Sequence, residues 1–450
     1  MNLYGLLQQR EAAGKPIRVG AIGTGVAGAS FLSQLRFIPG MQLVGVAELD
    51  MEKAKENCIK AGWPEDAISF GSSTNVINEG SKKKGIILTD DAEQLIRADL
   101  DVILEMTGNV EAGAYHAWTA LQEGKHVVMV TVEADALLGK ALKELADEKG
   151  LVYSLGYGDQ PALICDEVDW ARTSGFEVVC AGEWFRHYPD SQYYTPDTGW
   201  KYYGLSEDQV ATGDYNLKMY CSFVDGTKST IEMCAVANAC DLVPQSSGLS
   251  YLAVEYEDLP AVLKPKSEGG MLEHSGTVET LSSLKPDGTP LKRSFRFGVY
   301  VVFKGRSDRV RHYLSFFGGE RRIVTDSSGE YAIIYRPTHL IGLELGISVA
   351  SASLLGVPTG APSSFVAEVA TVAKKELNMG DILDGEGGYA VYGRLVPAEQ
   401  SLKGRYLPMG LSNKTQVIRQ VAKDSIITYD DVAMDESRFC YQIRKKIEKK

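Results

Sequence analysis

The chain has 450 residues and a formal net charge of -12, and its composition is 44% hydrophobic and 24% charged. This length exceeds that of one ordinary domain, so we expect two or three domains with globular cores. The negative charge argues against binding to nucleic acid or to an anionic membrane, because both need clustered positive charge, and it favours small-molecule chemistry.

The segment Met1 to Pro16 lacks the continuous apolar core of a signal peptide, and no later stretch is long enough to span a bilayer. We therefore expect a soluble, cytoplasmic protein. The seven cysteines are odd in number, scattered and never spaced as CxxC. Neither a disulfide framework nor a zinc site is indicated.

The first part of the chain alternates between strands and helices. An apolar strand over Ile17–Ile22 is followed by the glycine turn Gly23–Gly28, a helix over Ala29–Phe37 and a strand over Leu43–Ala47. The later candidates are strands at Val102–Leu104, Val127–Val130 and Leu151–Leu155 and helices at Ala112–Glu123 and Leu137–Lys149. This alternation predicts an α/β fold in which residues 1–155 form a Rossmann domain with a doubly wound parallel sheet.

After residue 155 the pattern predicts a mixed α/β second domain over residues 156–362. The pairs Asp225-Gly226 and Asp287-Gly288 suggest hairpin turns. Near its end, Thr338 is the expected N-cap of an apolar helix that stops at Gly356. Residues 363–434 then read as a small module of short strands, and residues 435–450 as a charged tail that we expect to be frayed.

The glycine turn predicts a dinucleotide site, because it stands between a strand and a helix. Gly23 permits the tight turn, Gly25 lets the backbone approach a pyrophosphate, and Gly28 allows close helix packing. The intervening Thr24, Val26 and Ala27 complete the loop, whose helix offers N–H groups to the phosphates. The alternative is a glycine turn that binds nothing.

Glu48 ends the second strand, where a carboxylate accepts hydrogen bonds from ribose hydroxyls and would repel a 2′-phosphate. We therefore expect NAD(H) to be preferred, with NADP(H) as the alternative. Glu48 and Asp50 could instead merely cap the next helix. At the carboxyl ends of two further strands we expect residues that border the nicotinamide, namely Thr107, Gly108, Thr131 and Glu133.

Three segments resemble the cofactor domain of homoserine dehydrogenases: Glu105–Gly108, Glu123–Val128 and Gly156–Pro161. The chain is more similar to the 1-deoxy-D-xylulose 5-phosphate reductoisomerase-like enzymes, which carry a C-terminal SAF (β-clip) module. The segments that match these enzymes are Asp225–Lys228 with Glu232-Met233, Val236–Ala239, Glu268–Gly270, Ser275-Gly276 and Arg336-Pro337 with His339-Leu340. Ala370–Leu383 and Lys423–Val432 resemble the two lobes of the SAF pattern.

The chain departs from this family at two places. Where the resemblance implies a lysine- and asparagine-rich substrate wall, the chain has Glu183–Tyr188 instead. The aromatic run from Trp184 to Tyr203 could form a lid or simply pack. The acidic Glu48 also differs from the NADP preference that the resemblance implies. From the matching and departing segments together we expect Arg186, His187 and Asn238 to bind substrate.

Hydride transfer at a carbon that bears oxygen needs an acid or base and a group that polarises the carbonyl. Lys228 and Glu232 are expected on one face of a strand, where they could do both or be a surface pair. Asp159 precedes Pro161 at the start of a helix and is either catalytic or a cap. Carboxylates such as Asp159 and Glu232 could converge on a divalent metal, but no ligand spacing supports one and no metal site is predicted.

Arg336 and His339 flank the helix start expected at Thr338, whose N–H groups would attract a substrate anion. His339 is the preferred catalytic histidine among the six in the chain. If the capping interpretation holds instead, these two residues serve the fold alone.

These patterns predict a homo-oligomeric NAD(P)-dependent oxidoreductase acting on a small hydroxy or keto compound, sugar-acid-like by analogy with other SAF proteins. The alternatives are a reductoisomerase acting on 1-deoxy-D-xylulose 5-phosphate, which would need NADPH and a metal, and a nucleotide sensor without catalysis. No nucleic acid or membrane partner is expected.

Overall fold

The computed structural model describes residues 2–82, 85–212, 215–293, 295–320 and 323–449. The chain divides into two compact units. The first contains the residues up to Leu163, then Leu340–Ala361 and the last two residues; the second contains Ile164–His339 and Pro362–Glu448. The domain boundaries expected at residues 155, 362 and 434 stay predictions.

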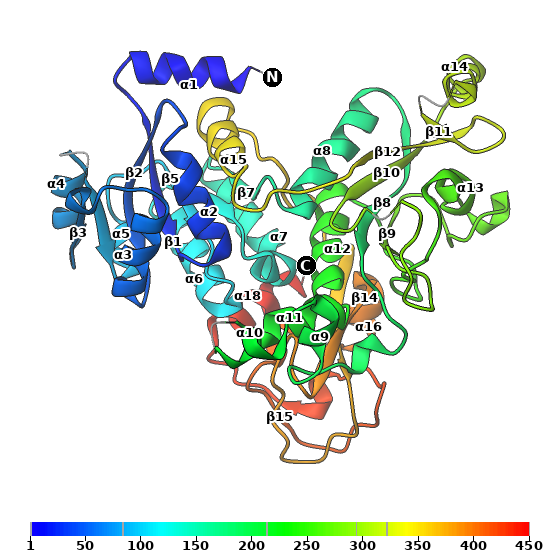
Figure 1. Ribbon diagram of the computed structural model, residues 1–450. Coiled ribbons are helices and arrows are strands. Elements are labelled where there is room, and N and C mark those ends of the chain that lie inside the picture. Colours follow the sequence, from blue (N-terminus) through cyan, green and yellow to red (C-terminus); the bar gives the residue numbers. More distant parts are fainter. Residues whose placement is uncertain (1, 83–84, 213–214, 294, 321–322, 450) are drawn as a thin grey trace. The chain divides into compact units, whose positions relative to one another are not determined.

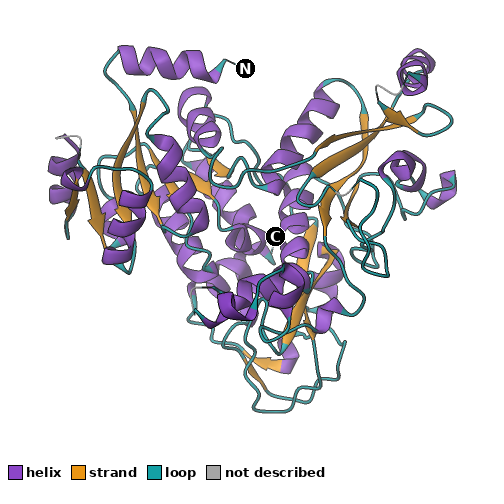
Figure 2. Ribbon diagram, in the orientation of Figure 1, coloured by secondary structure: helices purple, strands orange, loops and turns teal. Residues whose placement is uncertain are grey.

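The first unit is built on a seven-stranded parallel sheet, as predicted. The strands lie in the order β3-β4-β2-β1-β5-β6-β7, so the order reverses between β1 and β5. Helices lie on both sides of the strands in Figure 2. The bounds are β1 Ile17–Ile22, β2 Met41–Ala47, β3 Ile68–Phe70, β4 Ile86–Thr89, β5 Val102–Glu105, β6 His126–Met129 and β7 Tyr153–Leu155.

The helices of this unit are α1 Leu3–Ala12, α2 Val26–Leu35, α3 Met51–Lys60, α4 Thr74–Lys82, α5 Ala92–Ile96, α6 Val110–Gln122, α7 Val132–Glu148 and α15 Gly346–Ala350, with a π-helical turn at Ser351–Leu355. One core cluster joins apolar side chains of the sheet to Phe31 on α2, Cys58 on α3 and Val349 on α15. The segment that carries α15 is therefore part of the first unit's core, although it follows about 180 residues later in the chain.

The second unit contains a five-stranded mixed sheet in the order β11-β12-β10-β8-β9. Strand β10 is antiparallel to β8 and β12, whereas β9 is parallel to β8. These strands are labelled in Figure 1. The bounds are β8 Glu177–Phe185, β9 Thr277–Ser282, β10 Val299–Lys304, β11 Val324–Thr325 and β12 Tyr331–Arg336. Nearly all side chains of β8, β9 and β10 are buried, which explains why these strands lack a polar alternation.

The helices around this sheet are α8 Gln160–Thr173, α9 Gly199–Tyr203, α10 Glu207–Ala211, α11 Leu217–Val224, α12 Thr227–Cys240, α13 Leu259–Val262 and α14 Asp308–Gly319; α8 begins in the first unit. Helix α12 packs against β8 and β9 and also against the C-terminal strands β13 and β14. It is buried along almost its whole length.

The C-terminal part forms two small antiparallel sheets, which agrees with the short strands predicted there. The strands are β13 Ala367–Ala373, β14 Val391–Pro397, β15 Gln416–Val417 and β16 Val432–Ala433, with helices α16 Ala398–Gly404 and α17 Met409–Ser412 between them. The prediction of a frayed tail is wrong, because Phe439–Ile447 is helix α18. Its Arg444 is buried and forms an ion pair with the buried Glu368 on β13.

Among the described residues, the structure has no helix of sufficient length and apolar character to cross a membrane.

Candidate functional site

The glycine turn joins β1 to α2, and steric limits explain two of its three glycines. Gly23 has a φ of 96°, and a Cβ atom there would lie 2.7 Å from the carbonyl oxygen of Met106. A Cβ atom at Gly28 would lie 2.4 Å from the carbonyl oxygen of Gly23. At Gly25, by contrast, an added Cβ would meet no described atom within 4 Å. The backbone is therefore open at Gly25, the position at which the sequence predicts that a pyrophosphate approaches.

The residues that follow are also accessible. Gly25 and Val26 are exposed and Ala27 is half-buried. The first N–H groups of α2 have no acceptor within the helix, and the helix dipole makes this end attractive to anions. The turn thus fits the pyrophosphate of a dinucleotide.

Glu48 follows β2 and its carboxylate contacts the glycine turn. Its Oε2 accepts hydrogen bonds from the N–H and the hydroxyl of Thr24, at 2.9 and 3.0 Å. Its Oε1 accepts from the N–H of Leu49 at 2.9 Å. The cap of α3 is Asp50, which accepts from the N–H of Lys53 at 3.0 Å. Glu48 is therefore not the helix cap, and its oxygens keep lone pairs for a ribose hydroxyl.

The residues expected to border the nicotinamide come together at the ends of β5 and β6. The N–H of Gly108 donates to the hydroxyl of Thr131 at 2.9 Å, and the hydroxyl of Thr107 donates to the buried carboxylate of Glu105 at 2.5 Å. Glu133 is half-buried in the first turn of α7. Strand β5 lies next to β1, at the point where the strand order reverses and ligands of open α/β sheets bind.

A buried acid in the first unit was missed by the sequence analysis. The hydroxyl of Tyr153 donates to Oδ1 of Asp135 at 2.8 Å, and both side chains are buried. Burial raises the pKa of Asp135 to about 7. In sequence, Asp135 is one acidic residue among several in a helix, so no local signal could have identified it.

In the second unit, four predicted site residues lie at one edge of the five-stranded sheet. Arg186 and His187 follow β8, Arg336 ends β12, and His339 comes three residues later. Since β10 is antiparallel to both of these strands, with Val299 opposite Arg336, the ends of β8 and β12 flank the start of β10. We call this end of the sheet the arginine edge.

The two histidines at the arginine edge are held by different contacts. The ring of His187 stacks on Tyr251, with centroids 4.3 Å apart, and burial lowers its pKa. The Tyr251 hydroxyl donates to the carbonyl oxygen of Gly226, just before α12, at 3.1 Å. Nδ1 of His339 hydrogen-bonds to the carbonyl oxygen of Phe297 at 2.9 Å. Burial therefore favours the neutral form of His187. Through Tyr251, its ring stands close to the N-terminus of α12.

The prediction of a helix that begins at Thr338 is wrong. Strand β12 extends to Arg336, and α15 begins at Gly346. The pairing with β10 holds the backbone of β12 extended, and the following residues are turns without a helix. The predicted stop at Gly356, with φ 69°, is confirmed. Arg336 and His339 consequently do not flank a helix N-terminus.

Lys228 and Glu232 lie on helix α12, which corrects the prediction of a strand. Gly226 adopts a φ of 85° before the helix, so Asp225-Gly226 is a turn between two helices and not a hairpin. One helical turn separates the two side chains, and Nζ of Lys228 is 3.9 Å from Oε1 of Glu232. Their side chains are 15% and 2% exposed, so this is a largely buried pair and not a solvated one.

Two other predicted residues have clear structural contacts. Oδ1 of Asn238 accepts from the N–H groups of Val366 and Ala367 at 2.8 and 3.0 Å, which anchors the entry to β13. These contacts explain Asn238 without a ligand. Asp159 belongs to the first unit and directly precedes α8, where Oδ1 accepts from the N–H of Gln160 at 3.1 Å.

The aromatic run that could have formed a lid begins in the core. Trp184 is 1% exposed and packs against Tyr300 and Phe295, with centroids 4.9 and 5.2 Å apart. Further along, the rings of Tyr194 and Tyr202 stack at 4.3 Å. These contacts are those of packing residues.

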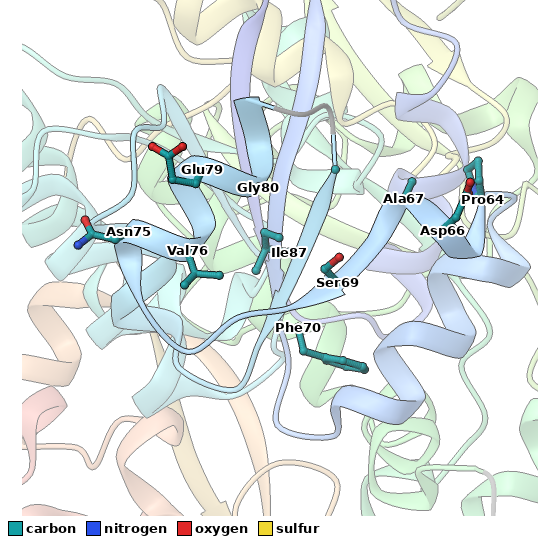
Figure 3. A pocket seen from close by; sticks show the side chains of 11 residues that line it. Pro64, Asp66, Ala67, Ser69, Phe70, Asn75, Val76, Glu79, Gly80 and Ile87 are labelled. Carbon is teal, nitrogen blue, oxygen red and sulfur yellow. The ribbon is translucent and has the colours of Figure 1, made fainter.

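Across the described ranges, no group of three or more His, Cys, Asp or Glu side chains is arranged to hold a metal ion. A cavity of about 610 Å³ lies at the β3 edge of the first unit, and Figure 3 shows side chains of its lining. The lining residues are Pro64, Asp66, Ala67, Ser69, Phe70, Asn75, Val76, Glu79, Gly80, Gly85 and Ile87. None of the predicted site residues is among them, so this cavity is separate from the glycine turn.

Two family models match the chain. Residues 19–154 match the NAD binding domain of homoserine dehydrogenase, and residues 158–345 match the catalytic domain of oxidoreductase DRL. The first match contains the glycine turn and Glu48, and the second contains the arginine edge with Lys228 and Glu232. A search of curated proteins found no match.

Several solved structures are similar in part. A protein from Klebsiella pneumoniae assigned to the oxidoreductases is 18% identical, with a TM-score of 0.37, over 77% of this chain and 87% of its own. Biliverdin reductase from Synechocystis is 22% identical (TM-score 0.25, 38% of this chain, 48% of its own). UDP-N-acetylglucosamine 3-dehydrogenase from Acidithiobacillus ferrooxidans is 19% identical (TM-score 0.27, 39% and 49%). The chain thus spans about half the length of the last two.

Proposed function

We propose that this oxidoreductase moves hydride between a nicotinamide dinucleotide, with NAD(H) preferred, and a small hydroxy or keto compound. That the chain is an NAD(P)-dependent oxidoreductase follows from the two family models. The preference for NAD(H) and the class of substrate are the proposed part. The observation that carries the proposal is the open backbone at Gly25 with the Glu48 carboxylate held against the same turn.

In this proposal the first unit binds the dinucleotide. The N–H groups at the start of α2 hold the pyrophosphate, and Glu48 accepts hydrogen bonds from the adenosine ribose. A 2′-phosphate would bring two negative charges to this carboxylate, which disfavours NADP(H). When bound, the nicotinamide ring supplies or accepts the hydride.

The second unit would bind the substrate and handle its proton. The Lys228 ammonium can donate a hydrogen bond to a carbonyl or alkoxide oxygen, and Glu232 can take up or return the hydroxyl proton. Their low exposure strengthens both interactions, because little water competes. Asp159 and His339 remain proposed as further acid–base groups, while Arg186, His187 and Arg336 would contact the substrate. The cytoplasmic location, the homo-oligomer and the SAF identity of the C-terminal module also remain proposals.

Fluorescence titration of the purified protein with NADH and with NADPH tests the cofactor preference. We expect NADH to bind at least about tenfold more tightly, a difference of about 1.4 kcal/mol. Glu48→Arg should abolish or reverse this preference. Asp50→Asn is the matched control, because it removes a nearby negative charge but keeps a residue that can cap α3.

Each contrary result has a distinct meaning. A wild-type preference for NADPH would reject the role of Glu48 and favour the reductoisomerase alternative, which should then turn over 1-deoxy-D-xylulose 5-phosphate with added divalent metal. Binding of NADH without turnover of any hydroxy or sugar acid would favour the nucleotide sensor.

A further inference from the structure

Besides Arg186 and Arg336, the arginine edge contains a third arginine, Arg296, which the sequence analysis did not identify. Arg296 lies three residues before β10, and Arg186 directly follows β8. The two strands are antiparallel neighbours, and the N–H of Trp184 donates to the carbonyl oxygen of Gly298 at 3.0 Å. The end of β8 and the segment before β10 therefore bring the guanidinium groups of Arg186 and Arg296 to the same end of the sheet.

Arg296 is held between aromatic rings. Its Cζ lies 4.3 Å from the ring centroid of Phe297 and 5.1 Å from that of Tyr203. The Tyr203 ring in turn lies 5.6 Å from that of Phe223, and Phe185 contacts both Phe223 and Phe297, at 6.0 and 5.6 Å. Aromatic faces hold a guanidinium plane while leaving the N–H groups at its rim able to bind a ligand.

Neither arginine has an acidic partner among the described residues. Arg296 is half-buried, and its Nε is buried and makes no hydrogen bond to any described group. Burial, followed by the charge of Arg186, lowers the pKa of Arg296, and no carboxylate contributes to oppose this. Two cations that repel each other in a partly desolvated place need a counter-charge, which a ligand would supply.

Two carboxylates near this edge face cations other than Arg186 and Arg296. Glu232 lies 3.9 Å from Lys228, and Glu167 interacts electrostatically with Arg336. Arg293 lies in the same segment as Arg296 but is exposed and has an acidic partner, because its Nη1 is 3.3 Å from Oε1 of Glu257. The positive charge of Arg186 and Arg296 is therefore left for an anion.

We propose that Arg186 and Arg296 form a binding site for the anionic group of the substrate, either a carboxylate or a phosphate monoester. Each guanidinium presents paired N–H donors that match two oxygens of such a group, and the rings of Phe297 and Tyr203 exclude water from the contact. The proposal rests on the proposed function and deepens it, because it makes the hydroxy or keto substrate an anion.

Isothermal titration calorimetry with inorganic phosphate and with glycolate tests this site on the full chain in chloride-free buffer. We expect the wild type to bind at least one of the two at millimolar concentration. Arg296→Gln and Arg186→Gln should each weaken that binding at least tenfold, and Arg296→Lys should restore only part of it, because it keeps the charge and loses the paired donors. Preference for phosphate or for glycolate tells which anion the substrate carries.

Arg293→Gln is the matched control and should bind as the wild type does. Far-ultraviolet circular dichroism and melting curves check that each variant is folded. The proposal is overturned if the wild type binds neither anion, or if a folded Arg296→Gln variant binds as tightly as the wild type. NADH titration of the same samples distinguishes failure of the anion site from failure of the proposed function. Variants that lose anion binding but keep the NADH affinity of the wild type support the anion site. Anion binding by a wild type that does not bind NADH rejects the dinucleotide function alone.

Discussion

Gly25 and Gly28 lie three residues apart in one turn, yet only Gly28 is a glycine that the fold requires. Gly28 is required by the fold, because any Cβ atom there would collide with the carbonyl oxygen of Gly23. Gly25 has an ordinary φ of -62° and open space around it, so the fold itself would accept alanine. A glycine that the fold does not need indicates that something outside the chain approaches the backbone.

This difference makes a prediction for two alanine variants. Gly28→Ala should lower the free energy of unfolding by about 1–3 kcal/mol through overpacking. Gly25→Ala should leave stability within about 0.5 kcal/mol of the wild type and weaken NADH binding about tenfold or more. Denaturant unfolding and NADH titration measure the two effects. If both variants lose the same free energy of unfolding, the conclusion that the fold leaves room for a side chain at Gly25 is wrong.

The buried Asp135 predicts a pH dependence of stability. Its pKa is raised from the ordinary value of 3.8 to about 7, so the folded state holds this proton more tightly than the unfolded state does. Its contribution to stability is complete below about pH 4 and is lost as the pH rises to about 7, by up to about 4 kcal/mol.

Asp135→Asn should flatten the fall in stability between pH 4 and pH 7, because the amide does not titrate. Urea unfolding across this range measures the effect. The control is Asp147→Asn, an exposed position on the same helix, paired with Lys143. If the free energy of unfolding falls with pH as steeply in Asp135→Asn as in the wild type, the pKa of Asp135 is not raised.

Among the elements, α12 shows why a helix can be mistaken for a strand. It is buried from Thr227 to Cys240 with few exceptions, so its sequence has no polar face and no helical period in its apolar residues. The preceding Asp225 forms a buried ion pair with Lys374, at 2.7 Å, and Lys374 also donates to the carbonyl oxygens of Tyr194 and Gly388. This ion pair joins the α11–α12 turn to the C-terminal strands.

Lys374→Met should therefore destabilise the second unit by about 3–5 kcal/mol, because it leaves the Asp225 carboxylate buried without its counter-charge. The double variant Asp225→Asn/Lys374→Met should lose less than the single variant. Lys375→Met is the control, since Lys375 is the exposed neighbour in sequence. Chemical unfolding of the four proteins measures the effect, and a single variant as stable as the control would refute it.

For the whole molecule, the main finding is that the first unit is discontinuous. Residues 340–361 leave the second unit and return to the first, where the N–H of Leu155 donates to the carbonyl oxygen of Gly360 at 2.7 Å. Gly342 of this segment lies against α2, because a Cβ atom there would be 2.5 Å from the carbonyl oxygen of Ala27. A late segment thus supports the helix that carries the glycine turn.

Leu345→Ala should accordingly destabilise the dinucleotide-binding unit by about 2–5 kcal/mol, as for other large core truncations. Leu345 is fully buried in the first unit's core, whereas Leu343 is 38% exposed and provides the control variant Leu343→Ala. Thermal unfolding with and without NADH measures this effect. If the NADH-stabilised transition is unchanged in Leu345→Ala, residues 340–361 do not support the first unit.

The sequence by itself determined the parallel sheet of the first unit, the glycine turn and the place of Glu48. These features depend on residues close together in the chain, such as the strand, turn and helix around Gly23–Gly28, so local pattern was sufficient to predict them. Only the tertiary structure decided that α12 is a helix, that Arg296 joins Arg186, and that Leu345 belongs to the first unit. The physical reason is that burial and charge pairing there depend on partners far away in sequence, which no local periodicity records.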